Sequence, residues 1–344
     1  MKRDGSMDTA EERILLAHGS GGELSQQLVA SVFARAFSNP ILQPLDDSGV
    51  IPGTGEDWAF TTDSYVVTPI FFPGGDIGRL AICGTVNDLS MSGARPLYLS
   101  AGFILEEGFL LADLQRIVES MGEAAAEAGV QVVTGDTKVV NRGAADGIFI
   151  NTAGIGRIPA GIRLSGRNAR PGDRVLVSGT LGDHGVAILS AREGLEFSTT
   201  LASDCAPLNH LVQRMVCASP HIHCLRDPTR GGLSSTLNEF ARQSGVGIWV
   251  EESRVPVKEE VRGACELLGL EPWFLANEGK LVAVVAEEDA PRVLREMQAH
   301  PLGRDAAIIG EVREEPRGKV VLRTPIGSTR LLDMMVGEPL PRIC

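Results

Sequence analysis

The 344-residue sequence has no long apolar run and no excess of basic residues. Its opening stretch, MKRDGSMDTAEERILLA, contains an apolar run of only four residues, too short for the hydrophobic region of a signal peptide. No segment approaches the roughly 18 apolar residues of a membrane span. The formal net charge of -12 lacks the basic footprint that nucleic-acid binding normally leaves. We therefore expect a cytoplasmic protein with no membrane or nucleic-acid partner.

Cysteine is also sparse. Six thiols spread over 344 residues do not resemble the disulfide framework of a small secreted domain, so we expect them to be reduced. Cys83, inside an expected helix, and Cys265, among apolar neighbours, are interpreted as core residues. A further group is spaced unlike a structural zinc site, and we interpret it as packed thiols and ordinary histidines. This group is Cys217, His221, His223 and Cys224.

The commonest nucleotide-binding motifs are missing. The chain contains no GxxxxGKS/T P-loop, and residues 19–24 (GSGGEL) do not fit GxGxxG. The glycine-rich stretch His18-Gly19-Ser20-Gly21-Gly22 precedes helical spacing over residues 24–37. Its glycines expose backbone N–H groups near a helix N-terminus, where a phosphate could lie. The alternative is a loop that only caps this helix.

The chain is longer than one ordinary core requires, so two domains are expected. Residues 168–173 (NARPGD) form a polar segment with a Pro-Gly turn between two apolar strands. Strands and helices alternate on both sides of it, including a helix over 111–128 and a buried strand over 130–134. We predict an α/β (α+β) fold, each half a mixed sheet covered by helices. The predicted domains are residues 1–165 and 166–336, followed by a tail over 337–344.

Acidic residues recur at one kind of position in the first half. Each is expected at the end of a strand or helix, beside a glycine or a small polar residue. They are Asp46 or Asp47, Asp63, Asp88 and Asp136. Oxygen ligands spread over several loops suit Mg²⁺, which also takes phosphate oxygens and reverses the local sign of an acidic site. The alternative for any one of them is helix capping or turn formation.

Two further residues are candidates for chemistry. Lys138 closely follows Asp136 and would pair with phosphate, or act as a base if it is buried; otherwise it is an ordinary exposed lysine. Glu278 lies in the segment Asn277-Glu278-Gly279-Lys280, ahead of an expected strand. Its carboxylate serves either the turn or, as a general base, the cleft between the halves.

The chain ends in a thiol on a segment that resists folding. Gly337, Pro339 and Pro341 favour an extended arm over residues 337–344, since proline fixes φ and removes a backbone donor. At roughly 3.3 Å per residue, this arm reaches about 25 Å. Cys344 is therefore either a chance ending or a reactive group that visits more than one place.

Seven segments occur in a fixed order along the chain. They are His18-Gly19-Ser20-Gly21-Gly22, Asp63-Ser64-Tyr65, Asn87-Asp88-Leu89-Ser90, Gly135-Asp136-Thr137-Lys138-Val139, Arg226-Asp227-Pro228-Thr229-Arg230-Gly231-Gly232, Asn277-Glu278-Gly279 and Pro341-Arg342-Ile343-Cys344. Together they resemble the HypE family of hydrogenase maturation proteins, within the aminoimidazole-ribotide-synthetase-like ATP-binding superfamily. The aspartate segments are shared across that superfamily, whereas the terminal Pro-Arg-Ile-Cys points to HypE proteins in particular.

The resemblance implies a two-domain fold, a β-barrel formed across a homodimer, and ATP bound with Mg²⁺ on the aspartate-bearing loops. The implied metal ligands are Asp46, Asp63, Asp88 and Asp136, with Asp47 as the alternative to Asp46. The implied nucleotide contacts are these aspartates together with Gly19, Ser20, Gly21, Gly22 and Lys138.

The resemblance also implies a reaction. The thiol of Cys344 would receive a carbamoyl group from the carbamoyltransferase HypF, and ATP-dependent dehydration would convert it to a thiocyanate. The cyanide would pass to iron held by the HypC–HypD complex, for the active site of a nickel–iron hydrogenase. Glu278 and Lys138 would be the candidate bases, and Arg342 would offset the negative α-carboxylate beside the thiol.

Two other functions fit parts of the sequence. A small-molecule kinase of the same superfamily, such as a thiamine-monophosphate kinase or a selenophosphate synthetase, would not need a terminal cysteine. The latter would want a reactive cysteine near the N-terminus, and none precedes Cys83. A non-catalytic scaffold would bind nucleotide and use its tail only for docking.

Overall fold

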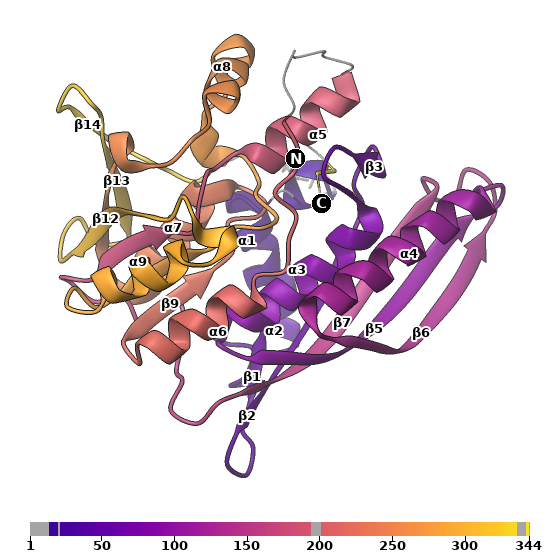
Figure 1. The fold of residues 1–344 in the computed structure, drawn as a ribbon, viewed down its shortest axis with the longest axis horizontal. Coiled ribbons are helices and arrows are strands. Elements are labelled where there is room, and N and C mark those ends of the chain that lie inside the picture. Colours follow the sequence, from indigo (N-terminus) through magenta and orange to yellow (C-terminus); the bar gives the residue numbers. More distant parts are fainter. Residues whose placement is uncertain (1–13, 20, 194–200, 336–341, 344) are drawn as a thin grey trace, which may run out of the picture.

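Figure 1 shows the computed structural model, which describes residues 14–19, 21–193, 201–335 and 342–343. Each half of the chain forms its own sheet, and helix α3 of the first half contacts α6 and β9 of the second. Within these residues, no helix combines the length and apolar character that a membrane crossing needs.

The first sheet has the strand order β1-β2-β7-β5-β6. All neighbours are antiparallel except β5 and β6, which are parallel. The bounds are β1 Gly49–Ile51, β2 Asp57–Tyr65, β5 Arg95–Glu106, β6 Gln131–Val140 and β7 Ile148–Ile158. Helices α3 (Ile77–Met91) and α4 (Leu111–Ala128) cover one face of this sheet (Figure 1). A short hairpin of β3 (Phe71–Phe72) and β4 (Gly75–Asp76) precedes α3.

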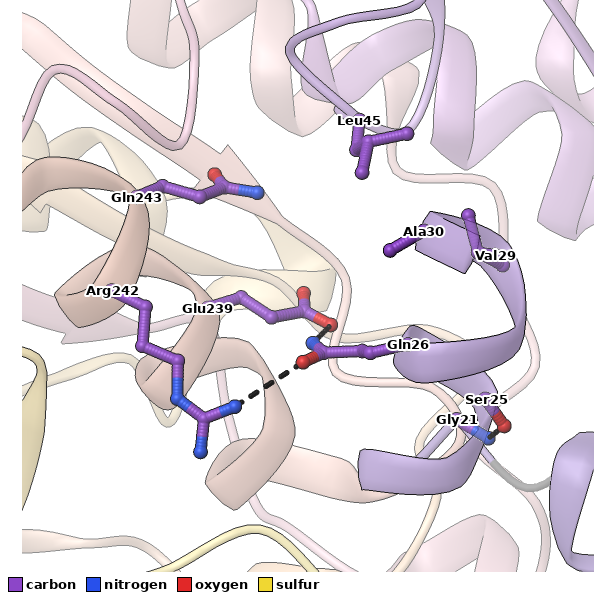
Figure 2. Close-up of a pocket in the computed structure, with 9 residues that line it drawn as sticks. All are labelled: Gly21, Ser25, Gln26, Val29, Ala30, Leu45, Glu239, Arg242 and Gln243. Atoms are coloured by element: carbon purple, nitrogen blue, oxygen red, sulfur yellow. Dashed lines mark hydrogen bonds between the residues drawn. The ribbon is translucent and has the colours of Figure 1, made fainter. Parts of the chain in front are cut away.

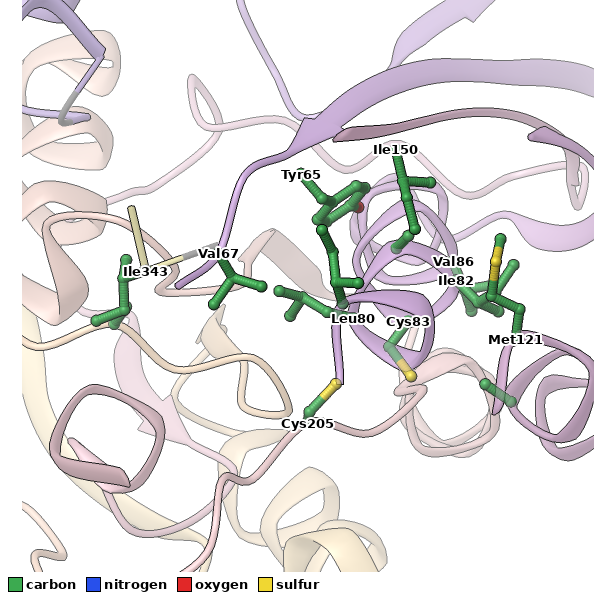
Figure 3. Packing of buried hydrophobic residues seen from close by; sticks show 14 of the residues in the cluster. Tyr65, Val67, Leu80, Ile82, Cys83, Val86, Met121, Ile150, Cys205 and Ile343 are labelled. Atoms are coloured by element: carbon green, nitrogen blue, oxygen red, sulfur yellow. The ribbon is translucent and has the colours of Figure 1, made fainter. Parts of the chain in front are cut away.

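Local sequence explains how α3 begins and packs. The Oδ1 of Asp76 accepts hydrogen bonds from the N–H groups of Gly78 and Arg79, at 2.8 and 3.0 Å, and so caps the helix. Gly78 lets α4 approach closely, because a Cβ there would lie 2.5 Å from the carbonyl oxygen of Ile117. Side chains of α3 and alternate side chains of β7 then fill one apolar core (Figure 3).

The edge strand β6 differs from expectation. The apolar run at 130–134 predicts a buried strand, yet Val132, Val133 and Val139 are 44%, 58% and 67% exposed in this chain. The expectation of burial is wrong for the single chain, because β6 pairs with β5 on only one side. Its free edge and apolar side chains have the character of an interface.

The second sheet has the order β14-β13-β10-β12-β8-β11-β9. Its strands are β8 Arg174–Val177, β9 Ile222–Arg226, β10 Gly247–Glu251, β11 Val282–Val285, β12 Ala307–Arg313, β13 Lys319–Arg323 and β14 Thr329–Leu331. Helix α7 (Gly232–Ser244) shares one core cluster with this sheet, and α6 (Asn209–Ala218) and α9 (Ala290–Gln298) share another.

The remaining helices lie around these layers. They are α1 Glu23–Leu28, the π-helical turn Val29–Phe33, α2 Ala34–Ala36, α5 Asp183–Glu193, α8 Glu259–Leu268 and the 3₁₀ turns Leu16–Gly19, Glu252–Arg254, Pro272–Phe274 and Pro301–Gly303. The helix predicted over 111–128 is confirmed, and residues 168–173 form a connection ahead of β8. The domain limits at 165 and 336 stay a prediction.

Candidate functional site

Buried carboxylates gather where the two halves meet. Burial raises the pKa of Asp88 well above its usual value, and the neighbouring carboxylates of Asp227, Asp63 and Asp47 raise it further. Burial likewise raises the pKa of Asp227 to about 8, again with contributions from Asp47 and Asp63. Glu278 belongs to the same group, because Asp227 and Asp63 raise its pKa beyond the effect of burial. We call these five residues the acidic cluster.

The structure distinguishes Asp47 from Asp46. The carboxylate of Asp46 accepts hydrogen bonds from the hydroxyl of Ser165 at 2.7 Å and the N–H of Gly166 at 3.0 Å. It therefore fastens the segment that connects the halves. Asp47 contributes to the acidic cluster instead, and it pairs with Arg226 at 2.8 Å. Of the two residues left open by the sequence, Asp47 is the one that belongs to the acidic cluster.

Secondary structure holds the cluster in place. Asp63 lies within β2 and Asp88 within α3, and the hydroxyl of Thr61 is 3.0 Å from Oδ2 of Asp88. The expectation that these aspartates end their elements is therefore wrong. Both elements run on past the polar residue, because Tyr65 and Leu89 beyond it are buried and extend the apolar face.

The Glu278 loop crosses from the second half into this cluster. Asn277 is fully buried, accepts from the N–H of Gly182 at 2.7 Å and donates to the carbonyl of Pro228 at 3.0 Å. Asn87 of α3 donates to the carbonyl of Glu278 at 3.3 Å. Glu278 is 2% exposed, and its Oε1 has no hydrogen-bond partner among the described residues. The loop thus presents an uncompensated carboxyl oxygen at the boundary between the halves.

The acidic cluster suits a divalent cation that arrives with a ligand. Among the described residues, no three Asp, Glu, His or Cys side chains converge closely enough to hold a metal by themselves. Mg²⁺ is usually held by one or two carboxylates together with phosphate oxygens and water. Neighbouring carboxylates help to raise the pKa values of Asp88 and Asp227, and Oε1 of Glu278 has no partner among the described residues. A bound cation would offset this concentration of negative charge.

The glycine-rich segment lies against the second half. The guanidinium of Arg230 donates to the carbonyl of Gly19 at 2.7 Å, and the N–H of Gly21 donates to the hydroxyl of Ser25 at 2.9 Å. Gly21 has φ +74°, and a Cβ there would lie 2.9 Å from Cβ of Arg230. Only glycine suits this close, left-handed position. Gly22 is buried ahead of α1, and Ser20 lies outside the described residues.

A pocket of about 420 Å³ adjoins this segment (Figure 2). It is lined by Gly21, Ser25, Gln26, Val29, Ala30, Leu45, Glu239, Arg242 and Gln243. The amide of Gln26 donates to Oε1 of Glu239 at 2.8 Å, and Glu239 in turn pairs with Arg226. Because Arg226 also holds Asp47, one chain of polar contacts joins the pocket to the acidic cluster.

Asp136 and Lys138 lie outside this cluster in the single chain. They pair with each other at 2.7 Å on β6, with side chains 71% and 69% exposed. In the sheet register Asp63 faces Thr152, and strands β7 and β5 carry that row to Gly135. Three interstrand steps of about 4.8 Å therefore place roughly 14 Å between Asp63 and this part of β6. Asp136 also lies mid-strand, not at the strand's end as expected.

The other predicted thiols and histidines have simple settings. Cys83, Cys224 and Cys265 are buried, as expected, but Cys217 is exposed near the end of α6, so its interpretation as a packing residue is wrong. The apolar stripe of α6 is formed by Leu211, Val212 and Met215, and Cys217 falls outside it. His221 pairs with Asp289 at 2.9 Å and His223 with Asp173 at 2.7 Å.

The described end of the chain is docked. Ile343 is 3% exposed and joins a core cluster to which both halves contribute (Figure 3). The guanidinium of Arg342 pairs with Asp146, and the carbonyl of Arg342 accepts from the N–H of Thr68 at 3.1 Å. Residues 342 and 343 of the predicted arm are thus held against the first half. Cys344, like residues 336–341, lies outside the described residues.

Sequence reasoning missed several residues of the site. Asp227 lies inside a motif that the sequence displays, but the proline after it suggests only a turn. Asp204, whose Oδ1 accepts from the N–H of Glu278 at 3.1 Å, sits in a segment without periodicity. His184 appears only as the start of a helix, and nothing in its neighbourhood links it to residues 159 positions later.

The chain is similar to known protein families over most of its length. Residues 45–158 match the N-terminal domain of the AIR synthase related proteins, and residues 170–323 match their C-terminal domain. The carbamoyl dehydratase HypE of Azotobacter vinelandii is 56% identical over 338 residues, covering 98% of this chain and 99% of that relative. The chain belongs to the HypE family. HypE of Escherichia coli K12 is 53% identical over 336 residues, covering 96% and 99% of the two chains.

Solved HypE structures share the whole architecture. HypE in complex with ATP superposes with a TM-score of 0.82 at 54% identity, covering 96% of this chain and 100% of that chain. A chain of a HypE–HypF complex gives a TM-score of 0.86 at 51% identity, covering 90% and 99%. A thiamine monophosphate kinase of Aquifex aeolicus, at 20% identity and a TM-score of 0.67, shares the fold alone. The predicted fold class is confirmed.

Proposed function

We propose that this protein is an ATP-dependent dehydratase that converts a carbamoyl group on the Cys344 thiol to a thiocyanate. The observation that carries the proposal is the docking of Ile343, the residue before Cys344, in a core cluster to which both halves contribute. Glu278 of the acidic cluster donates its N–H to Asp204, and the neighbouring Ser203 contacts His184, which binds the tail. We therefore propose that the group carried by Cys344 is processed at the acidic cluster.

The reaction needs a better leaving group than the amide oxygen. Attack of the carboxamide oxygen on the γ-phosphorus of ATP forms an O–P bond and releases ADP. Loss of the C–O bond then expels inorganic phosphate with its electron pair, and removal of both N–H protons completes the C≡N bond. When bound at the acidic cluster, Mg²⁺ offsets the charge that this phosphoryl transfer develops. Asp47, Asp63, Asp88 and Asp227 are the residues that would hold it.

Glu278 is the proposed base for the nitrogen protons. Its Oε1 is buried without a hydrogen-bond partner among the described residues, and the raised pKa makes its carboxylate a stronger base than that of an ordinary glutamate. The buried amides of Asn277 and Asn87 fix its loop from both halves, so the carboxylate is oriented before substrate enters.

The nucleoside is proposed to occupy the pocket of Figure 2. Its rim at Gly21 borders the glycine-rich segment, whose N–H groups suit phosphates. Val29, Ala30 and Leu45 give it apolar walls, and Gln26 and Gln243 give polar groups at its edge. A largely apolar pocket with a few polar groups is typical of a site for a planar base.

A homodimer would explain why Lys138 and Asp136 lie exposed and far from the acidic cluster of their own chain. The valines of β6 leave apolar surface on a free strand edge, which a second copy of this sheet could cover. Because these two residues lie roughly 14 Å from Asp63 in their own sheet, we propose that they complete the site of the partner subunit. There Lys138 would offset phosphate charge or assist Glu278 as a base.

The proposed partners follow from the same family. HypF would load the carbamoyl group onto Cys344, and the HypC–HypD complex would accept the cyanide for a hydrogenase iron centre. A tail that is loaded outside, processed inside and unloaded outside must leave its docked position between steps. The alternative, a small-molecule kinase, shares the fold but gives the docked terminus no role.

Intact mass spectrometry tests this proposal. The protein is loaded by HypF with carbamoyl phosphate and then given Mg-ATP. We expect a carbamoyl gain on Cys344, followed by loss of one water only with ATP. Glu278→Gln should load normally but lose its water at least about 100-fold more slowly, whereas the exposed Glu119→Gln should match the wild type. Consumption of ATP with Cys344 unchanged would favour the kinase.

A further inference from the structure

The docked tail is held through its main chain. The carbonyl of Ile343 accepts from Nε2 of His184 at 2.8 Å. The carbonyl of Arg342 accepts from the guanidinium of Arg192 at 2.8 Å and from the N–H of Thr68 at 3.1 Å. His184 and Arg192 both belong to α5, one at its start and one in its last turn. The peptide bond to Cys344 carries the Ile343 carbonyl, so His184 binds the group next to the proposed substrate.

This contact fixes the tautomer of His184. A carbonyl oxygen can only accept, so Nε2 carries the proton and Nδ1 is an acceptor. The hydroxyl of Ser203 lies 2.8 Å from Nδ1 and therefore donates to it. The same hydroxyl oxygen accepts from the N–H of Cys205 at 3.1 Å. His184 is fully buried, and its ring meets the edge of Phe72 at a centroid distance of 5.6 Å.

The segment that orients His184 also holds the Glu278 loop. Asp204 lies between Ser203 and Cys205, and its Oδ1 accepts from the N–H of Glu278 at 3.1 Å. Its Oδ2 pairs with Lys280 at 3.1 Å, two residues further along that loop. Gly279 packs so closely that a Cβ there would lie 1.8 Å from the carbonyl oxygen of Asp204. The segment 203–205 thus contacts His184, which binds the tail, and also contacts the loop that carries Glu278.

We propose that His184 is a positioning residue that fixes the register of the tail by binding the Ile343 carbonyl. Through its contact with residues 203–205, it also fixes the position of the tail relative to Glu278. This inference rests on the proposed dehydration of a group carried by Cys344. Recognition of main-chain carbonyls suits a tail that must dock repeatedly, since these contacts do not use the thiol that is to be modified.

The backbone of the tail agrees with a specific register. Arg342 has φ +57°, a left-handed conformation that a non-glycine residue adopts only when surrounding contacts hold it. Ile343 then packs beside Val67 in the core of Figure 3. A shift of one residue would put the charged Arg342 in this apolar position and withdraw its carbonyl from Arg192.

Two substitutions of His184 distinguish the effect of its Nε2–H donor from the effect of its side-chain volume. His184→Leu removes the Nε2 donor, whereas His184→Gln keeps an N–H donor at a similar distance from the backbone. His221→Leu is the control, because that histidine is 56% exposed and pairs with Asp289 away from the tail. Each full-length variant is loaded by HypF and followed through a single turnover with Mg-ATP. Hydrogen exchange at the Thr68 amide reports docking independently of chemistry, because its acceptor is the Arg342 carbonyl.

We expect His184→Leu to load within about twofold of wild type and keep its KM for ATP. Its dehydration should slow, and its Thr68 exchange accelerate, by about tenfold. His184→Gln should recover most of both effects, and His221→Leu should show neither. Arg192→Met should act like His184→Leu, which keeps the test available if that variant does not fold.

Two results would overturn the inference. In one, wild type dehydrates its carbamoyl group and His184→Leu does so equally fast with Thr68 still protected. In the other, the Leu and Gln variants are equally impaired, so that packing and not the donor matters. A wild-type protein that loads but never dehydrates would instead overturn the proposed function, and Thr68 exchange would still decide whether His184 holds the tail.

Discussion

The N–H of Glu278 donates a hydrogen bond to Oδ1 of Asp204, and this contact joins the acidic cluster to the segment that orients His184. Asp204 is buried, yet Lys280 and His184 lower its pKa despite the opposing effect of burial. It is therefore charged at neutral pH and serves as the anchor of the Glu278 loop.

Replacing this anchor should be costly. Asp204→Ala leaves Lys280 buried without its partner, and breaking a buried pair in this way typically destabilises a protein by about 3 kcal/mol. We expect a loss of that size in urea unfolding, with slower dehydration of loaded protein. Glu56→Ala, which breaks the exposed Arg157–Glu56 pair, should cost no more than about 1 kcal/mol. Equal losses in the two variants would contradict the anchoring role.

Filling the pocket of Figure 2 should weaken nucleotide binding. Val29 lines it, whereas Val32 lies on the same helical segment, is 51% exposed and does not line it. We expect Val29→Trp to raise the KM for ATP by about tenfold or more by occupying the base's volume, and Val32→Trp to leave it unchanged. The dependence of the single-turnover dehydration rate of loaded protein on ATP concentration measures both. An unchanged KM in Val29→Trp would place the base elsewhere.

The folded state should lose stability in acid. Burial lowers the pKa of His184 below its ordinary 6.5, while Asp204 and the Ile343 carbonyl oppose that shift. A lowered folded-state pKa means that its stabilising contribution is complete above pH 6.5 and is lost as pH falls through the folded value. The free energy of unfolding measured in urea should therefore fall below about pH 6.5. His184→Gln should remove this dependence; its persistence in that variant would assign it to another group.

The β6 edge should govern assembly. Val133→Lys places a charge on a strand edge that we propose is covered by a second copy, and such changes disfavour edge pairing. Sedimentation should show a dimer for wild type and a monomer for Val133→Lys. Leu110→Lys, at a leucine that is 65% exposed at the start of α4, should remain dimeric. Loss of dehydration in the monomer would also support a role for Lys138 across the interface.

Helical and strand periodicity predicted much of the architecture. The helix over 111–128 is as expected, because its apolar face repeats at helical spacing and Gly129 adopts the left-handed conformation that ends it. The short strands β1, β3 and β4 were not predicted, and neither were β9, β13 and β14. β9 has only five residues and is flanked by polar ones, and β13 and β14 are short and bounded by turns. Whether such short segments form strands depends on the strands they pair with.

The site was predicted in parts. Asp63, Asp88 and Glu278 converge, and Asp47 joins them where the sequence left Asp46 or Asp47 open. Asp136 and Lys138 could not be placed from one chain, because they lie three strands away on a free edge. The link from His184 to Ile343 joins residues 159 positions apart, which no local pattern can reveal.

The fate of the carbamoyl oxygen tests the central claim most directly. The protein is loaded on Cys344 with a carbamoyl group whose oxygen is ¹⁸O, and a single turnover is run with unlabelled Mg-ATP in unlabelled water. Transfer of the γ-phosphoryl group to that oxygen predicts one ¹⁸O in the inorganic phosphate for each thiocyanate formed. Thiocyanate accompanied by unlabelled phosphate would contradict the account, because the oxygen would then have left without being phosphorylated.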